Sequence, residues 1–164
     1  MVEVRLVPLR EAERAVFFAE EVANYADQQV REAAWSRDEA LERAQEALTP
    51  VLERDYAEGR ARGDRLWAAV DSSRQTVGWI WVKPLQDRAV FLEQMTVAGT
   101  FRRQGYGRAM LRALEEQIAR ERIEELRLNV FRANEPARGL YEAAGYEQTG
   151  GDERRLFLRK RLRA

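Results

Sequence analysis

Residues 96–107 read TVAGTFRRQGYG and join a strand-like run to a strongly amphipathic helical run. The run before them, residues 89–97, is rich in β-branched and aromatic side chains, which is typical of a β-strand. After them, Met110, Leu111, Leu114 and Ile118 recur at helical spacing and form an apolar face. The pattern predicts a strand, a glycine- and arginine-rich loop, and a helix that begins near residue 105.

The start of this helix is a candidate binding site for a phosphate group. A helix N-terminus presents unpaired backbone N–H groups and the positive end of the helix dipole, which suits a pyrophosphate. Gly105 and Gly107 let the backbone approach phosphate oxygens, and Arg102, Arg103 and Arg108 add positive charge. The alternative is an ordinary loop with solvated arginines. The loop is neither a Walker loop nor the three-glycine dinucleotide fingerprint.

The composition restricts the chemistry available to the chain. Its 164 residues include no cysteine and no histidine. This excludes cysteine nucleophiles, thiolate metal sites, catalytic triads and histidine general bases, and we expect no metal site. Acid–base chemistry is therefore left to Asp, Glu, Tyr, Lys, a terminal amine, the backbone or water.

Length, charge and hydropathy set the expected organisation. A chain of 164 residues predicts one domain with a full hydrophobic core. The 28 basic and 28 acidic side chains balance, which argues against a nucleic-acid partner. No run resembles a signal peptide or a membrane span, so we expect a cytoplasmic protein without a membrane partner.

The remaining segments complete an α/β pattern with a mainly antiparallel sheet. Strand-like and helical runs follow one another in the order β, α, α, β, β, β, α, β, α, β, β. The expected strands are residues 2–6, 66–70, 76–82, 89–97, 126–130, 146–148 and 155–158. The expected helices are residues 11–34, a second that begins with a capping box at Ser36, 105–122, and one capped by Asn134. Pro50 either kinks the second helix or opens a new one with Thr49 as its cap.

Two signatures in the chain resemble those of the GCN5-related N-acetyltransferase (GNAT) family. The run Arg102-x-x-Gly105-x-Gly107 is similar to the family's Arg/Gln-x-x-Gly-x-Gly/Ala signature. The run NEPARGLYEAAGY at residues 134–146 is similar to the second signature, Asn-x-x-Ala-x-x-Leu-Tyr-x-x-x-Gly-Phe/Tyr. The order and separation of the two runs also agree.

The resemblance implies a GNAT fold: about seven strands in a mixed, mainly antiparallel sheet, about four helices, and a splay between the fourth and fifth strands. It implies a single N-acetyltransferase domain over residues 1–164. Residues 66–160 would be the acetyl-CoA-binding core, and residues 1–65 a variable helical region on the acceptor side. It also implies acetyl-CoA as co-substrate and a primary amine of a small molecule, peptide or protein as acceptor.

The resemblance assigns the pantetheine arm of the cofactor to the splayed strand and the pyrophosphate to the turn. Tyr141 takes the position from which family members protonate the departing thiolate, although an aromatic residue of the core is the alternative. Asn134 is expected to cap a helix, and the family adds a contact toward the cofactor arm. The cofactor-binding residues implied in this way are Met95, Thr96, Val97, Arg102, Arg103, Gln104, Gly105, Tyr106, Gly107, Arg108, Asn134 and Tyr141.

Glu93 is the candidate general base, because it interrupts an apolar strand. Strict alternation places it on one face with Phe91, Met95 and Val97, and Gln94 on the other. A carboxylate among apolar neighbours can accept the amine proton through water, whereas a cross-strand ion pair with one of the many arginines is the alternative.

The acceptor side is less defined by the sequence. Trp35 and Tyr25, with Glu21 and Asp27, are candidates for an acceptor pocket, whereas Trp79 and Trp81 are expected in the core. Transfer of another acyl group, transfer to a hydroxyl, and a non-catalytic acyl-CoA sensor stay open as alternatives. We expect a monomer or a homodimer formed through exposed edge strands.

Overall fold

The computed structural model describes residues 2–162, and its strands form one seven-stranded sheet within that range. The strand order is β1-β2-β3-β4-β5-β7-β6. Each neighbouring pair is antiparallel except β4 and β5, which run parallel. The bounds are β1 Arg5–Pro8, β2 Arg65–Val70, β3 Thr76–Pro84, β4 Ala89–Val97, β5 Glu125–Phe131, β6 Glu147–Gly151 and β7 Arg155–Arg161. This confirms the mixed, mainly antiparallel sheet expected from the sequence.

Four α-helices and one short 3-10 helix complete the described residues. Their bounds are α1 Glu11–Arg31, α2 Arg37–Arg62, the 3-10 helix η1 Gly99–Phe101, α3 Tyr106–Arg120 and α4 Glu135–Ala143. Pro50 lies inside α2, so one helix spans the segment and no second helix opens there. Ser36 precedes α2 as predicted, but its side chain makes no capping hydrogen bond. No helix among the described residues has the length and apolar character needed to cross a membrane.

The chain divides into two compact units, which are described separately. One comprises Met1–Pro8 and Asp64–Ala164 and contains the whole sheet with α3 and α4. The other is Leu9–Gly63 and consists of the antiparallel helical pair α1 and α2. The second unit ends at Gly63, which adopts a left-handed conformation with φ +96°.

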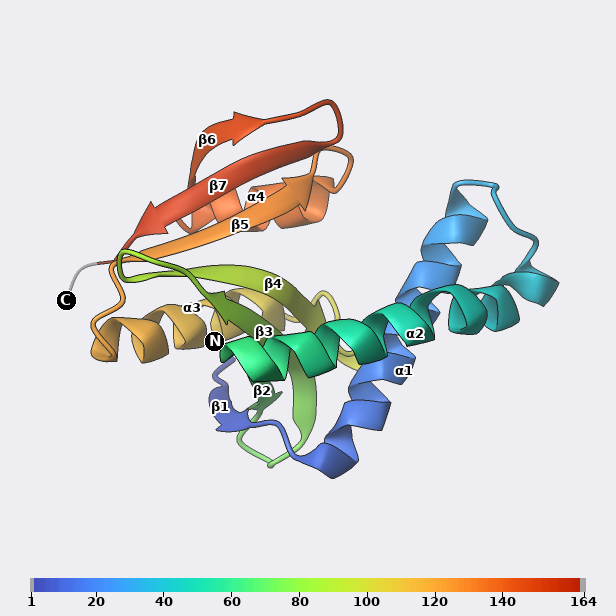
Figure 1. Cartoon of the computed structure of the whole chain (residues 1–164), viewed down its shortest axis with the longest axis horizontal. Helices are drawn as coiled ribbons and strands as arrows, with labels where there is room; N and C mark the ends of the chain where they lie inside the picture. Colours follow the sequence, from blue (N-terminus) through green and yellow to red (C-terminus); the bar gives the residue numbers. More distant parts are fainter. Residues whose placement is uncertain (1, 163–164) are drawn as a thin grey trace. The chain divides into compact units, whose positions relative to one another are not determined.

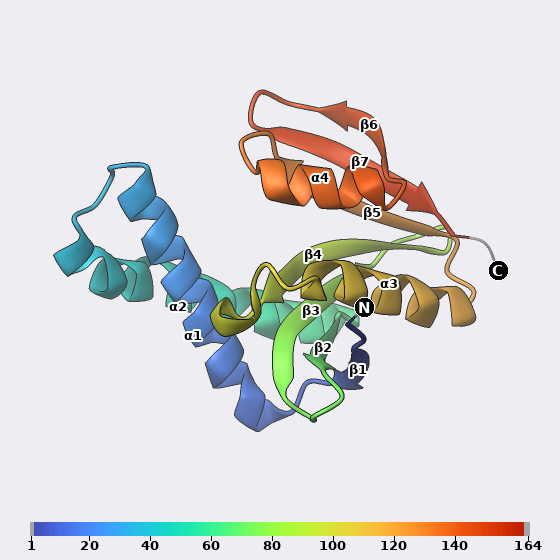
Figure 2. The ribbon, with the colours of Figure 1, turned by 180° about the vertical axis from the view of Figure 1, so that it is seen from behind.

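The core of the sheet unit lies between one face of the sheet and the helices α3 and α4, which cover that same face (Figures 1 and 2). Strand β5 shows the alternation that produces it. Leu126, Leu128 and Val130 are buried, whereas Arg127 and Asn129 between them are exposed. Helix α3 adds its predicted apolar stripe, of which Met110, Leu111, Leu114 and Ile118 are all fully buried.

The helical unit has a small core of its own. Val22 and Ala26 of α1 pack with Ala40 and Ala44 of α2, and the small side chains allow the helices to approach closely. Near the loop that joins α1 to α2, the rings of Tyr25 and Trp35 meet edge to face at 5.7 Å. Both aromatic residues therefore contribute to packing within this unit.

Strand β4 contains an irregularity that matters for the site. Gln94 of β4 pairs with Trp81 of β3, and Leu92 of β4 pairs with Val82, the next residue of β3. Glu93, between Leu92 and Gln94, therefore has no partner in the register. This is a β-bulge, which inserts one residue and interrupts the alternation of faces. Leu92 before the bulge and Met95 after it both belong to the core face.

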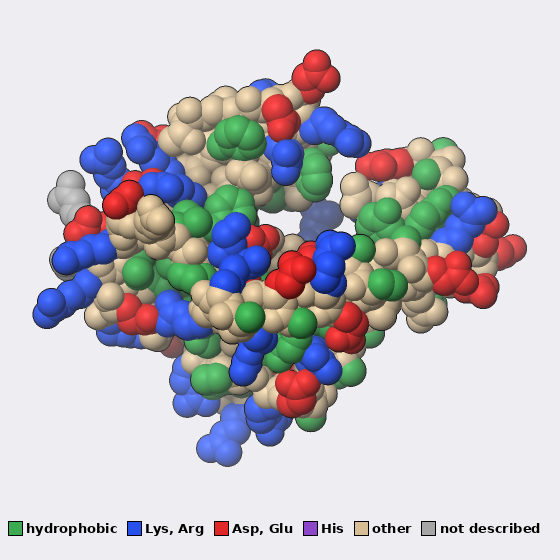
Figure 3. Space-filling view, in the orientation of Figure 1, with side chains coloured by type: hydrophobic (Ala, Val, Ile, Leu, Met, Phe, Trp, Pro, Cys, Tyr) green, Lys and Arg blue, Asp and Glu red, His purple; other side chains and the backbone are tan. Residues whose placement is uncertain are grey.

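Charged side chains of both signs are intermixed over the face seen in the space-filling view (Figure 3). This distribution matches the balanced composition of the chain, with 28 basic and 28 acidic residues.

Candidate active site

The predicted phosphate-binding turn is a tightly ordered connection between β4 and α3. Gly105 precedes α3 with φ +88°, and Arg103 also has a positive φ of 61°. Gly105 is required there because side chains with a Cβ rarely adopt this conformation. The rings of Phe101 and Tyr106 meet edge to face at 5.6 Å and fasten η1 to the start of α3. The first backbone N–H groups of α3 are thereby held at a fixed place.

The polar side chains of the turn divide into two groups. Arg102 donates from Nε to the carbonyl oxygen of Val97 at 3.3 Å, and Gln104 donates to the carbonyl oxygen of Thr100 at 3.1 Å. These two residues support the turn itself. Arg103 and Arg108 are exposed and make no ion pair within residues 2–162. Their guanidinium groups are therefore available to an anion at this helix end.

Gly107 brings the two signature segments together. A Cβ atom at this position would lie 3.6 Å from Leu140 of α4 and 3.8 Å from Val97 at the end of β4. The first turn of α3, the last residue of β4 and the middle of α4 thus meet around one glycine. Residues 96–107 and 134–146, which are separated in the sequence, are neighbours in the structure.

The predicted splay between β4 and β5 is present. The parallel register begins at Ala89 opposite Glu125 and ends at Leu92 opposite Leu128. Beyond this point β4 continues in register with β3, and β5 continues in register with β7. The two strands diverge (Figures 1 and 2), and Met95, Thr96 and Val97 lie on the diverging part of β4.

Tyr141 is a buried residue of α4, with only 8% of its surface exposed. Its ring meets the ring of Tyr146 at 5.5 Å. Its hydroxyl makes no hydrogen bond to another residue of the described range 2–162. Burial raises the pKa of Tyr141 to about 12, because the phenolate would lose its hydration. The hydroxyl therefore carries its proton at neutral pH.

A polar network behind Tyr141 escaped the sequence analysis. Glu115 of α3 accepts hydrogen bonds from the Tyr146 hydroxyl at 2.7 Å and from the Lys160 ammonium at 2.9 Å. Burial, the Glu115 charge and this hydrogen bond raise the pKa of Tyr146. The network joins α3, β7 and Tyr146, which immediately precedes β6, and it fixes the ring against which Tyr141 packs. One signal was available: Glu115 lies on the α3 face that includes Leu111 and Ile118.

Asn134 caps α4 as predicted. Its Oδ1 accepts a hydrogen bond from the backbone N–H of Ala137 at 3.3 Å. The residue is exposed.

Glu93 lies elsewhere than the strict alternation predicts. It is the bulged residue, so its side chain stands with Phe91 and not with Met95 and Val97, which pack on the core face. The predicted shared face with Phe91 is therefore correct, but that with Met95 and Val97 was wrong, because the bulge adds a residue and shifts the alternation by one. Lys83 lies beside both side chains: its Nζ is 3.8 Å from Glu93 Oε1 and 5.9 Å from the centre of the Phe91 ring. An ion pair is thus present, as the alternative expected, but the partner is a lysine and not one of the arginines.

The prediction that two tryptophans lie in the core is confirmed, whereas the predicted acceptor role of two other aromatic residues is not tested. Trp79 and Trp81 are buried as predicted, and Trp81 donates from Nε1 to Asp64 at 2.8 Å. Trp35 and Tyr25 pack on each other, and the guanidinium of Arg43 lies 5.8 Å from the Trp35 ring. Their role toward an acceptor stays a prediction.

The sequence of this chain is similar to those of known acetyltransferases. The model of the acetyltransferase (GNAT) family matches residues 27–146. The N-acetyltransferase YycN of Bacillus subtilis is 26% identical over 151 residues, which covers 89% of this chain and 94% of YycN. The N-acetyltransferase YdgE of the same organism is 28% identical over 161 residues, covering 96% and 97% respectively.

Solved structures agree with the fold. The PaiA N-acetyltransferase of Thermoplasma acidophilum, in complex with coenzyme A, superposes with a TM-score of 0.71 at 16% identity and covers 97% of this chain and 99% of that one. The crystal structure of YycN gives a TM-score of 0.68, with 89% and 93% covered. The sheet order, the parallel β4–β5 pair and the match of the family model over most of the chain lead to one conclusion. This chain belongs to the acetyltransferase (GNAT) family and is an acetyltransferase enzyme.

Proposed function

We propose that this enzyme transfers the acetyl group of acetyl-CoA directly to a primary amine. The observation that carries the proposal is the junction around Gly107. It places a helix N-terminus, the diverging end of β4 and the helix of Tyr141 within contact distance of one another. An acyl-CoA needs all three: an anion site, an edge along which its arm can extend, and a proton donor for the thiolate.

The cofactor would bind in two parts. Its pyrophosphate is assigned to the backbone N–H groups of residues 103–108, with Arg103 and Arg108 as unpaired cations beside them. Its pantetheine arm is assigned to the β4 edge at Met95, Thr96 and Val97, beyond the last β4–β5 pair. A coenzyme A complex of PaiA and an acetyl-CoA complex of a GNAT acetyltransferase from Elizabethkingia anophelis, similar in fold, support this assignment.

The reaction needs three proton and charge movements. The neutral amine attacks the thioester carbonyl carbon, and the C–S bond then breaks. The departing thiolate takes the proton of the Tyr141 hydroxyl, whose raised pKa keeps it protonated before the reaction. The amine proton leaves to water and from there to the carboxylate of Glu93, which is 34% exposed and therefore in contact with solvent.

The two units would divide the substrates between them. Residues 66–160 would bind the cofactor, and residues 1–65 would contribute to recognition of the acceptor within one N-acetyltransferase domain. Within the helical unit, the Tyr25 and Trp35 pair and the Asp27 carboxylate, 3.9 Å from Arg37, are the groups suited to a cationic amine. The enzyme would act as a monomer or a homodimer in the cytoplasm.

Substitution of Gly107 tests the cofactor site. In Gly107→Ala the added methyl group is accommodated, since its nearest neighbours stand at 3.6 and 3.8 Å. Gly107→Val adds two further methyl groups to the junction, and we expect it to weaken coenzyme A binding about tenfold or more. Calorimetric titration of both variants with coenzyme A measures the difference. Equal affinity of Gly107→Val and the wild type, with an intact fold, would contradict the assignment.

A second measurement tests the reaction. Release of free coenzyme A thiol from acetyl-CoA is followed with polyamines, amino acids, aminoglycosides and peptides as acceptors. Mass spectrometry then locates the acetyl group on the acceptor nitrogen. A product acetylated on oxygen, or thiol release that no amine accelerates, would overturn amine acetylation.

A further inference from the structure

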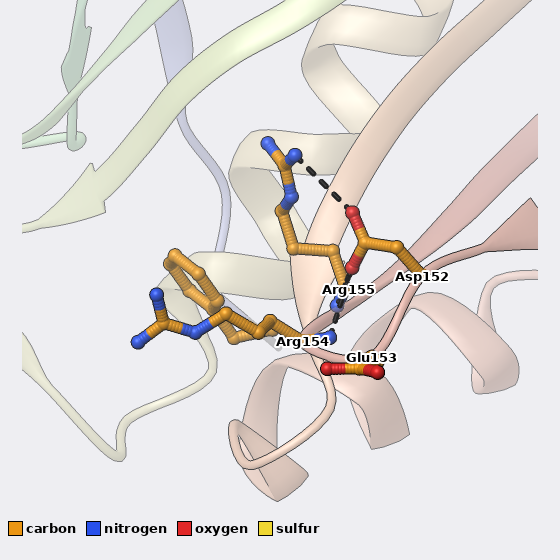
Figure 4. Close-up of a pocket in the computed structure, with 5 residues that line it drawn as sticks. Asp152, Glu153, Arg154 and Arg155 are labelled. Atoms are coloured by element: carbon orange, nitrogen blue, oxygen red, sulfur yellow. Dashed lines mark hydrogen bonds and ion pairs between the residues drawn. The ribbon is translucent and has the colours of Figure 1, made fainter.

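A pocket of about 510 Å³ lies at the end of β5, against the turn that joins β6 to β7. Its walls are Phe131, Asp152, Glu153, Arg154 and Arg155, and Figure 4 shows it from close by. All five residues belong to the sheet unit. No part of the proposed catalytic chemistry uses them.

The turn is held in shape by Asp152. Its Oδ1 accepts the backbone N–H groups of Arg154 at 2.9 Å and Arg155 at 2.7 Å, and its Oδ2 lies 3.3 Å from the Arg155 guanidinium (Figure 4). These bonds lower the pKa of Asp152, because they stabilise the carboxylate. The negative charge of Asp152 is thus already matched inside the turn, and the Arg155 guanidinium is engaged with it.

The Arg154 guanidinium, unlike that of Arg155, has no carboxylate partner among the described residues. Its side chain makes no ion pair or hydrogen bond to any residue within 2–162, although the neighbouring Arg155 and Arg159 of β7 both have carboxylate partners. Figure 4 shows the Glu153 carboxylate and the Arg154 guanidinium extending in different directions from the turn. The pocket therefore presents one unmatched guanidinium, a group suited to hold a carboxylate through two parallel hydrogen bonds.

Beside this cation the pocket offers an exposed aromatic ring. Phe131 is 53% exposed, as are to a similar degree two other large apolar side chains, Val16 and Leu41, but Phe131 alone among the three lines this pocket. It is the last residue of β5 and pairs with Arg155. By alternation it shares a face with Asn129, away from the buried Leu128 and Val130.

The same face carries the candidate base. Leu92 of β4 lies opposite Leu128 on the core face, and Phe91 lies opposite Arg127 on the other face. Glu93 stands with Phe91 on that second face, next to the point where the strands diverge. Phe131 is three residues further along β5 than Leu128, a distance of roughly 10 Å at the rise of a strand.

We propose that Phe131 and Arg154 form an acceptor subsite that binds an apolar group and a carboxylate on the amine substrate. The inference rests on the proposed amine acetylation and names the class of its acceptor: a short peptide or amino-acid derivative. Its amine reaches the splay near Leu128, its apolar group lies on Phe131, roughly 10 Å further along β5, and its carboxylate binds Arg154 in the same pocket. Two or three residues of extended chain span this distance.

Paired peptides test the subsite. Ala-Ala-Phe with a free carboxylate and the same peptide with a C-terminal amide present nearly identical amines, so that they differ at the far end alone. We expect Arg154→Ala to raise the KM of the free-carboxylate peptide about tenfold or more and to leave that of the amide unchanged. Phe131→Ala should raise both KM values. The ratio of the two KM values cancels any general effect on the cofactor site.

Arg161→Ala is the matched control. Arg161 lies at the opposite end of β7 and, like Arg154, has no ion pair within the described range. Its replacement should not change the ratio. A ratio that stays the same in Arg154→Ala, or changes equally in Arg161→Ala, would overturn the subsite. Thermal unfolding of each variant confirms that it is folded.

Binding without the reaction separates this inference from the proposed function. The probe 3-phenylpropionate carries the ring and the carboxylate but no amine, and 3-phenylpropionamide is its uncharged partner. Backbone NMR shifts at residues 152–155 should respond to the acid, with affinity lost about tenfold or more in Arg154→Ala. Specific binding of the acid without acetylation of any peptide would refute amine acetylation and leave the subsite standing. Equal shifts with acid and amide would refute the subsite.

Discussion

Tyr141 and Glu93 stand on opposite faces of the sheet, in opposite surroundings. Tyr141 lies in the core between the sheet and its helices, where burial raises its pKa to about 12. Glu93 protrudes from the bulge of β4 on the other face, 34% exposed and 3.8 Å from an ammonium group. The difference suits the two proposed roles: burial keeps the Tyr141 phenol protonated, as a proton donor requires, whereas the exposed Glu93 carboxylate is in contact with the water that would carry the amine proton.

The largest effect on kcat is expected from the removal of the buried Tyr141 hydroxyl. Tyr141→Phe removes the hydroxyl and keeps the ring that packs on Tyr146. If the hydroxyl protonates the thiolate, kcat falls about 10²–10⁴-fold, with the affinity for coenzyme A nearly unchanged. Steady-state kinetics and calorimetry measure the two quantities.

Tyr146→Phe is the control for Tyr141→Phe. It also removes one buried hydroxyl, but one that donates to Glu115 and does not face the reaction. We expect a loss of stability of about 1–3 kcal/mol, because Glu115 loses a hydrogen-bond donor, and a far smaller change in kcat. Equal kcat losses in the two variants would assign both tyrosines to packing.

The same burial predicts a second, smaller effect at alkaline pH. The folded-state pKa of Tyr141, about 12, exceeds the ordinary value of 10.0, so its stabilising contribution is complete below pH 10 and is lost as the pH rises toward 12. The free energy of unfolding should therefore fall more steeply in the wild type than in Tyr141→Phe, by at most about 3 kcal/mol over this window. Urea unfolding at several pH values between 8 and 11.5 measures the two slopes. Parallel slopes would mean that the Tyr141 hydroxyl is not desolvated.

A smaller effect is expected from the replacement of the exposed Glu93. Glu93→Gln should lower kcat/KM at pH 7 roughly tenfold, less than the about 10²–10⁴-fold usual for a positioned general base, because water can replace the carboxylate. Activity should recover as the pH rises and more of the amine is neutral. A pH–rate profile identical in shape to that of the wild type would show that Glu93 is not the base.

Lys83→Met separates the base role from the ion pair. It keeps the apolar stem beside Phe91 and removes the charge that faces Glu93. An exposed ion pair contributes only about 0–1 kcal/mol, so stability should barely change. We expect activity within about threefold of the wild type, since the carboxylate remains. If Lys83→Met and Glu93→Gln instead reduce kcat/KM alike, the pair acts as a structural unit.

Features that depend on neighbouring residues were predictable from the sequence. The apolar stripe of α3, the Asn134 cap and the extent of β4 all follow from local patterns, and the structure confirms each. Strand β1 was expected at residues 2–6 but spans Arg5–Pro8. Pro8 is tolerated there because β1 is an edge strand with a single partner, β2.

Features that depend on distant segments were not predictable. The bulge at Glu93 is defined by the register with β3, and the run VFLEQMTV reads the same with or without it. The pocket at Phe131 requires the end of β5 to meet a turn more than twenty residues further on. The Glu115 network likewise joins side chains that are 31 and 45 positions apart. Such contacts are set by tertiary structure, which local patterning does not encode.

The place at which the helical unit leaves the sheet has a consequence for how such enzymes diversify. The chain departs after Pro8 and returns at Arg65, and Pro8 lies opposite Trp67 on the neighbouring strand. Exit and re-entry are therefore adjacent, as they are in a loop grafted onto a scaffold. Because the entropy of closing a loop grows only slowly with its length, the 55 residues of Leu9–Gly63 can be lengthened, shortened or exchanged at little cost to the β1–β2 pairing. Recombination at these two positions would give the sheet unit a different helical unit in a single step.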